Sequence, residues 1–168
     1  ALQHAFVNEF SAPDANGRVV YTRKNSDGGA VVQGVNMELN VVPSGSFTFN
    51  GGFTLQKSTY ENAQEFGEKR FFRTPDDYGY FTMNWKATDR LQISSSGNYT
   101  GTMLVPYFGN TLPEGKNGIL KTSERFYELD LKSSYDFKLN GAKLRIFAGI
   151  KNMFNAYQDD FDAGIDRD

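Results

Sequence analysis

The most regular stretch of the chain runs from Tyr127 to Ile150, where apolar and polar positions alternate with a period of two. Successive side chains of a β-strand point to opposite faces, so this pattern predicts a long strand followed by a second one. The apolar positions of the first strand are Tyr127, Leu129, Leu131, Ser133, Tyr135, Phe137 and Leu139, and the polar ones are Glu128, Asp130, Lys132, Ser134, Asp136 and Lys138. Asn140-Gly141 then suits a two-residue type I′ turn, which predicts a long antiparallel hairpin.

The same alternation predicts five further strands upstream. Their apolar positions start at Leu2, Val31, Phe47, Phe81 and Leu91, and the last of these strands extends to Val105. The segment from Arg18 to Lys24 is expected to be a short β excursion within a loop. The chain should therefore contain about seven long strands.

The connections between these strands alternate in length. Pro43–Gly45, Thr88–Asp89 and Asn140–Gly141 are tight turns by composition, whereas the stretches 10–28, 57–77 and 106–122 are long and polar. All tight turns then lie at one end of the sheet and all long loops at the other. The predicted fold is all-β, a long antiparallel up-and-down meander.

Composition excludes several classes of protein. The 168 residues can form a single piece, 1–168, and 15% aromatic content argues against disorder. A formal net charge of −2 gives no field for nucleic acid, and the lack of cysteine excludes disulfides and thiol catalysis. No apolar run approaches the ~20 residues of a transmembrane helix, but membrane barrels need none.

The separation of tight turns and long loops to opposite ends of the sheet favours part of a transmembrane β-barrel. Such barrels have short periplasmic turns, long external loops and strands of roughly 9–11 residues or more. Small residues on the apolar face, among them Ser95, Gly97, Gly101 and Ser133, would pack a soluble core poorly. The alternative is a soluble β-barrel or sandwich that binds a ligand, and a passive porin-like channel is a third reading. A barrel wall should leave Leu129, Leu131, Phe137 and Ile146 uncovered on the outside of a curved sheet, whereas a soluble barrel would enclose them.

Two stretches of the chain resemble TonB-dependent outer-membrane receptors. Val31–Tyr60 resembles a strand pair of their barrels, with a tight turn followed by an aromatic strand. Glu124–Phe161 resembles the penultimate strands, in which an Asn-hydrophobic-Phe pattern (here Asn152, Met153 and Phe154) precedes a tyrosine, here Tyr157 with one residue fewer in between.

This resemblance implies a fragment of the C-terminal part of the barrel. The plug domain, the TonB-contacting segment and a final strand with an aromatic end are not found, and about seven strands cannot close a barrel of about 22. The resemblance implies an active importer of a nutrient such as an iron-siderophore, a cobalamin or a glycan, in the outer membrane of a Gram-negative bacterium. It implies no catalysis and no cofactor. The implied partners are outer-membrane lipid, a small nutrient ligand and the TonB complex, reached through the absent plug domain.

Ligand-binding residues are expected in the long loops. Arg70, Phe71, Phe72 and Arg73, beside Lys69, mix cations with aromatic rings and could hold an anionic chelate or a lipopolysaccharide phosphate. The alternative is that a loop in water simply carries charges. In the acidic tail, Asp160 and Asp162 are further candidates; a calcium site there is possible on chemical grounds, but the spacing is not that of an EF-hand and a plain acidic loop is favoured.

Catalytic motifs are not found. His4 has no serine or cysteine partner signature, and the loop Gly109–Lys116 departs from a phosphate loop by one residue and by Asn117. Glu124, Glu128 and Asp130 share one polar strand face and are interpreted as a solvated wall. Trp85, Tyr127 and Tyr135 could form an interfacial aromatic belt or ordinary cross-strand pairs.

Overall fold

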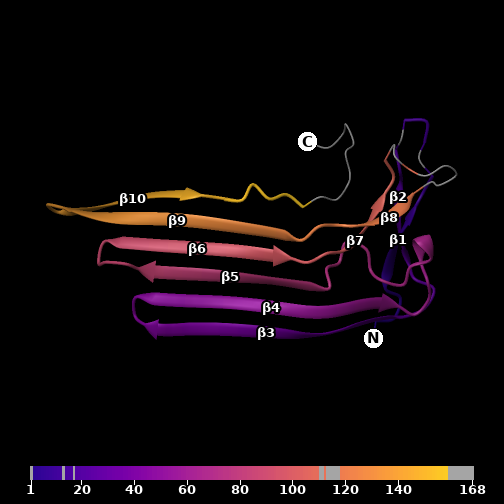
Figure 1. Cartoon of the computed structure of the whole chain (residues 1–168), viewed down its shortest axis with the longest axis horizontal. Coiled ribbons are helices and arrows are strands. Elements are labelled where there is room, and N and C mark those ends of the chain that lie inside the picture. The colour runs from indigo at the N-terminus through magenta and orange to yellow at the C-terminus, as the bar shows by residue number, and fades with distance from the viewer. Residues whose placement is uncertain (1, 13, 17, 110–111, 113–117, 159–168) are drawn as a thin grey trace.

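The computed structural model describes residues 2–12, 14–16, 18–109, 112 and 118–158. Six long strands form one antiparallel sheet with the order β10-β9-β6-β5-β4-β3 (Figure 1). Their bounds are β3 Ala30–Ser44, β4 Phe47–Tyr60, β5 Asp77–Lys86, β6 Leu91–Thr100, β9 Phe126–Leu139 and β10 Ala142–Ile150. Neighbours in the sheet follow one another along the chain, which confirms the predicted all-β meander.

The connections sort by length as predicted. The three tight turns lie together at the left of Figure 1, here called the turn end, and the three long connections lie at the right, the loop end. Leu139 pairs with Ala142, so the hairpin has a two-residue turn. The predicted type I′ turn is wrong, because φ is positive at Gly141 (78°) and not at Asn140. A positive φ at the second central residue alone is the pattern of a type II turn, in which glycine is favoured.

The strand register gathers the predicted apolar positions on one face of the sheet, here called the outer face. Residues directly opposite in an antiparallel pair point to the same side. One row across the sheet shows the result; it consists of Val41, Phe49, Met83, Ser95, Leu131 and Ile150. The alternation therefore predicted correctly which residues share a face in all six strands.

The outer face is not covered by any strand that the structure describes. Leu131, Phe137 and Ile146 are 38%, 41% and 53% exposed, and Leu129 is half-buried beside them. The buried apolar side chains of the described residues are Val7, Ala30, Met103 and Val105, and none of these lies on the outer face. Because the sheet is a single layer, the reading as a soluble barrel or sandwich with a dry core finds no support in the described chain.

Aromatic rings lie across glycines on the outer face. A Cβ on Gly97 would collide with the ring of Phe81, and one on Gly79 would come within 2.8 Å of the Phe53 ring. Phe53 in turn stacks with Tyr99, with ring centroids 6.0 Å apart. Gly97, one of the small residues predicted to pack a soluble core poorly, and Gly79 thus provide space for neighbouring rings.

The aromatic residues predicted to form an interfacial belt lie at two levels along the strands, one near each end of the sheet. Tyr127 contacts Tyr99 near the loop end, with centroids 4.9 Å apart, while Tyr135 and Trp85 lie toward the turn end. Eight residues separate Tyr127 from Tyr135, which is about 26 Å along a strand and about 20 Å in height at a tilt of about 40°. This spacing is close to the height of the apolar band of a membrane barrel.

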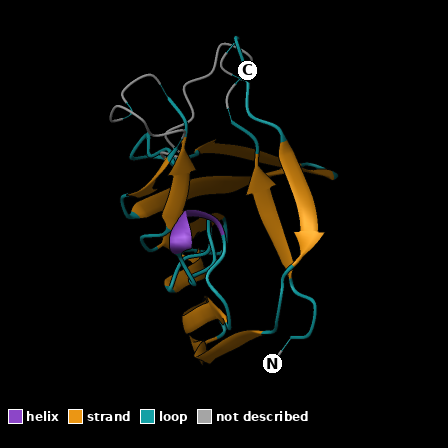
Figure 2. Cartoon of the chain, turned by 90° about the vertical axis from the view of Figure 1, so that its right-hand side faces the viewer, coloured by secondary structure: helices purple, strands orange, loops and turns teal. Residues whose placement is uncertain are grey.

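Two predicted strands differ from the structure in their pairing. The N-terminal one is shortened to β1 (Phe6–Phe10) and pairs with β2 (Tyr21–Asn25), while Leu2 alone bridges to Ala30 of the main sheet. The strand predicted from Leu91 to Val105 breaks after Thr100, and β7 (Leu104–Tyr107) pairs instead with β8 (Ile119–Thr122). Alternation identifies a strand without naming its partner, so these two small sheets were not predicted. The loop end, seen face on in Figure 2, carries both of them.

Among the residues that the structure describes, no helix has the length and apolar character needed to cross a membrane.

Candidate ligand-facing surfaces at the loop end

The three long connections meet through five aromatic side chains, here called the loop aromatic cluster. Phe10 of β1 is its centre, with ring centroids 5.2 Å from Tyr21, 6.1 Å from Phe66 and 5.2 Å from Phe108. Phe66 belongs to the short 3₁₀ turn η1 (Glu65–Gly67) and also contacts Phe72 at 6.0 Å. Each long connection contributes at least one ring, so the loop end is packed as one unit.

The four residues of the predicted basic-aromatic cluster do not form a single surface. Phe71 stacks on Tyr60 with centroids 4.2 Å apart, whereas Phe72 belongs to the loop aromatic cluster. The backbone N–H of Arg73 donates to the carbonyl of Leu104 at 2.8 Å. Arg70 is exposed and forms an ion pair with Glu68. Ligand binding by these four residues stays a prediction, but two of them serve mainly to pack the loops.

Glu68 fixes the backbone that leads to Arg70. Its carboxylate accepts hydrogen bonds from the backbone N–H of Arg70 at 3.0 Å and of Lys69 at 2.9 Å, and from the Arg70 guanidinium at 3.2 Å. These bonds, the one from the Arg70 N–H first, hold the pKa of Glu68 below its ordinary value of about 4.5. An anionic ligand would have to compete with this carboxylate for Arg70.

Replacing Glu68 by Gln is expected to loosen this segment. A neutral amide accepts weaker hydrogen bonds than a carboxylate, and the pair is partly exposed, so we expect trypsin to cut after Lys69 and Arg70 about two to five times faster. Because the folded pKa is depressed, the stabilisation is present above about pH 4.5 and is lost as pH falls through the folded pKa. Glu65→Gln, three residues earlier, is the matched control, and equal cleavage rates in both variants would contradict the role of Glu68.

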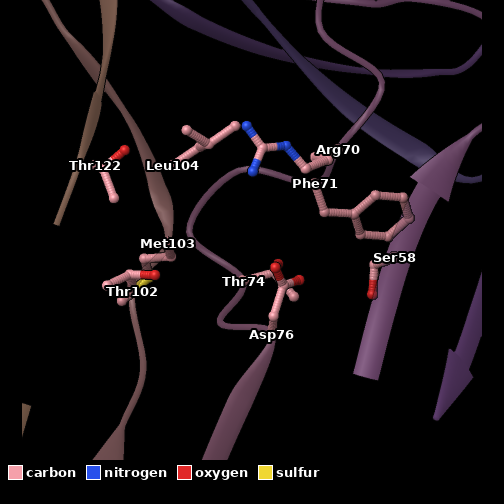
Figure 3. Close-up of a pocket in the computed structure, with 9 residues that line it drawn as sticks. All are labelled: Ser58, Arg70, Phe71, Thr74, Asp76, Thr102, Met103, Leu104 and Thr122. Carbon is pink, nitrogen blue, oxygen red and sulfur yellow. The ribbon is translucent and has the colours of Figure 1, made fainter. Parts of the chain in front are cut away.

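Arg70 and Phe71 also line a small cavity of about 40 Å³ between the loops. Figure 3 shows the Arg70 side chain extending toward Leu104, with Thr74 and Asp76 on another wall. A volume of this size holds one or two water molecules and no nutrient. The cavity is therefore too small to be the ligand site of an importer.

The polar face of the sheet, here called the inner face, differs in charge between its two halves. The inner positions of β9 and β10 include Asp130, Lys132, Asp136 and Arg145, and the Arg145 guanidinium bonds to both Asp136 oxygens at 2.6 and 2.8 Å. Inner positions of β4, β5 and β6 are hydroxyls, amides, glycine and tyrosines, with Lys86 as the one cation at the turn end.

The centre of this uncharged area is Tyr80, which sequence reasoning did not select. Tyr80 is opposite Gly52 on one side and Asn98 on the other. Tyr80 is 50% exposed, and its ring lies close to where a Cβ on Gly52 would be. The sequence did indicate such a surface. Tyr78 and Tyr80 occupy positions on the polar face of their strand, and the first charged residue on that face is Lys86.

The remaining predicted sites show no arrangement of side chains that would bind a ligand or a metal in the described residues. Asp160, Asp162 and most of the loop Gly109–Lys116 lie outside the described residues. His4 is exposed, with a φ of 54°. No group of three or more metal-ligating side chains occurs within the described parts of the chain.

The carboxylates interpreted as a solvated wall have local partners. Glu128 accepts from Asn98 at 3.3 Å and Asp130 accepts from the backbone N–H of Asn152 at 2.8 Å. The Asn152 side chain in turn bonds to both the N–H and the carbonyl of Ala156. These hydrogen bonds explain why the Asn-hydrophobic-Phe pattern has an asparagine just after the end of the strand.

One comparison with known proteins identifies a family. The model of the family described as TonB dependent receptor-like, beta-barrel, matches residues 4–153. No curated protein matches the chain. The matched range includes all six strands of the main sheet, both small sheets of the loop end and the whole of the uncharged area around Tyr80.

Proposed function

Because the chain belongs to the β-barrel family of TonB-dependent receptors, we propose that it forms part of the wall of an outer-membrane receptor that imports a nutrient actively. Members of this family are receptors and transporters rather than enzymes. In this proposal the loop end faces the outside of a Gram-negative cell and the turn end faces the periplasm. The energised TonB complex would act through a plug domain, and the nutrient would be an iron-siderophore, a cobalamin or a glycan.

The observation that carries the proposal is the uncovered outer face. A soluble protein does not expose a continuous apolar surface across six strands, whereas a barrel wall exposes such a surface to lipid. Leu131, Phe137 and Ile146 lie in it with more than a third of each side chain exposed. The inner face carries amides, hydroxyls and paired charges, as the wall of a wet or plugged lumen requires.

The test places a fluorophore on either side of the wall in the intact receptor. Ser133 and Ser134 are neighbours on β9, Ser133 on the outer face opposite Ile93 and Ala148, Ser134 on the inner face opposite Gln92 and Phe147. Each is changed to cysteine and labelled, and the receptor is reconstituted in vesicles. We expect brominated acyl chains to quench the label at Ser133→Cys and not at Ser134→Cys.

Two results would end the proposal. Equal quenching of both labels by aqueous iodide would place both faces in water and leave a soluble binding module. Uptake of the limiting nutrient that continues unchanged in cells lacking the TonB energising complex would leave a passive channel.

A further inference from the structure

The uncharged area of the inner face is centred on Tyr80 and has nine positions on three adjacent strands. We call it the Tyr80 surface; its members are Asn50, Gly52 and Thr54 of β4, Tyr78, Tyr80 and Thr82 of β5, and Ser96, Asn98 and Thr100 of β6. Hydroxyl and amide side chains occupy seven of the eight positions around the central tyrosine, and Gly52 occupies the eighth. Each of these groups can both donate and accept hydrogen bonds.

Gly52 leaves room for the Tyr80 ring, which lies over this residue of the neighbouring strand. A Cβ at this position would come within 2.5 Å of a ring carbon, so any other residue would push the ring away. Half of the Tyr80 side chain is exposed, and among the described residues no group bonds to its hydroxyl. An exposed aromatic face with a polar tip suits a ligand that is apolar on one side and hydrogen-bonding at its rim.

Hydrogen bonds hold the side chains around the ring in place. The Thr54 hydroxyl donates to Asn36 at 3.0 Å, and the Asn36 amide donates to Glu38 at 3.2 Å. On the other side, Asn98 donates to Glu128 at 3.3 Å. A surface that is already ordered loses less conformational entropy when a ligand binds.

The charges nearest to the Tyr80 surface exclude one class of ligand. Glu38 is opposite Gly52 and Glu128 is opposite Asn98, so a carboxylate lies on either side of the row that contains Tyr80. No cation occupies any of the nine positions. An anionic ferric chelate would be repelled here and would find no cationic partner, whereas a neutral ligand would find acceptors for its hydroxyl or amide protons.

The Tyr80 surface lies near the loop end of the wall. Tyr80 is three residues from Asp77, where β5 begins after the long connection, a distance of about 10 Å along the strand. A ligand that enters from the loop end therefore reaches these residues before Asp136, Lys143 and Arg145 near the turn end.

We propose that the Tyr80 surface binds an uncharged ligand that presents a ring face to Tyr80 and hydroxyl or amide groups to the surrounding side chains. This proposal rests on the proposed function, since it assigns a substrate class to the importer. The chemistry is shared by neutral oligosaccharides and by the amide-bearing rim of a corrinoid. Anionic ferric chelates do not share this chemistry, because they carry negative charge.

Calorimetric titration of the purified full-length receptor in detergent tests the proposal. The probes are maltoheptaose, cyanocobalamin and ferric citrate, the last as the anionic comparison. We expect one of the two neutral probes to bind, at least tenfold weaker binding after Tyr80→Ala, and a change of less than about threefold after Tyr80→Phe, which keeps the ring face. Thr48→Ala, on the inner face of β4 outside the Tyr80 surface, should leave the affinity unchanged.

Three results would overturn the proposal: no binding of either neutral probe, an affinity that Tyr80→Ala leaves unchanged, or binding of ferric citrate that depends on Tyr80. Each variant is first shown to shift in mobility on boiling, so that a misfolded protein is not scored as a loss of binding. These failures leave the receptor in the outer membrane and coupled to TonB, so they are distinguishable from failure of the proposed function, which would appear as altered quenching or uptake.

Discussion

Arginine in place of Ser133 is expected to lower the free energy of unfolding of the intact receptor by about 1–3 kcal/mol in a lipid bilayer. Ser133 lies near the middle of β9 on the outer face, between Ile93 of β6 and Ala148 of β10. Ser133 is two residues from Tyr135, which is about 5 Å in height from the aromatic rings near the turn end, so a guanidinium there lies in the outer part of the hydrocarbon region. Its transfer into the hydrocarbon region is costly even though the side chain can bend toward the interface.

The matched variant is Ser134→Arg. It introduces the same side chain in place of the same residue, one position along the strand, but on the inner face opposite Gln92 and Phe147. We expect a change of less than about 1 kcal/mol there, because the lumenal side stays polar. Urea unfolding of both variants in vesicles measures the difference. Equal effects would show that the outer face does not contact hydrocarbon.

The sequence was sufficient to predict the faces of the sheet because side-chain direction in a strand has a fixed period. A slip of one residue would move every apolar side chain to the other face, so a chain with one apolar face specifies its register strongly. Alternation alone therefore places Leu131 and Met83 on the same face of the sheet. The sorting of turns and loops was predictable for a related reason, since short turns can only join neighbouring antiparallel strands.

Partners of the short strands could not be predicted in the same way. Phe6–Phe10 alternates like the start of a long strand, yet its hydrogen bonds go to Tyr21–Asn25. The pairing of β6 with β5 extends one bond beyond Thr100, from the N–H of Gly101 to the Asp77 carbonyl, and it stops there because β5 begins at Asp77; the chain then turns into β7. These choices depend on contacts between loops that are far apart in sequence.

The candidate site was the least predictable part. Cations and aromatic rings at Arg70–Arg73 attract attention in a sequence, but their structural partners, Glu68, Tyr60 and the loop aromatic cluster, are visible only in three dimensions. Tyr80 was overlooked for the opposite reason. Its significance comes from uncharged neighbours on two other strands, and the register between strands is what brings Asn98 and Gly52 to its sides.

The second large effect is expected at the centre of the loop aromatic cluster. Phe10→Ala removes ring contacts to Tyr21, Phe66 and Phe108, which lie on all three long connections. Each ring pair contributes about 0.5–1.5 kcal/mol beyond the burial of apolar area. Two of the pairs, those with Phe66 and Phe108, join different connections, so we expect about 1–3 kcal/mol less docking free energy between the loops. In the docked state the β1–β2 hairpin should remain paired, because Val7 of β1 stays buried.

Hydrogen exchange of the intact receptor, followed by mass spectrometry, measures this loss. A deficit of about 2 kcal/mol raises the population of the opened loop end about 30-fold, and exchange should accelerate together in β1–β2 and in β7–β8. Phe6→Ala is the control, since Phe6 is on the same strand but is 67% exposed and contacts only Arg23 among the ring and cation contacts of the described residues. Acceleration confined to β1–β2 would mean that the long connections dock independently. Acceleration in both sheets would mean that a ligand contacting one loop also restrains the others.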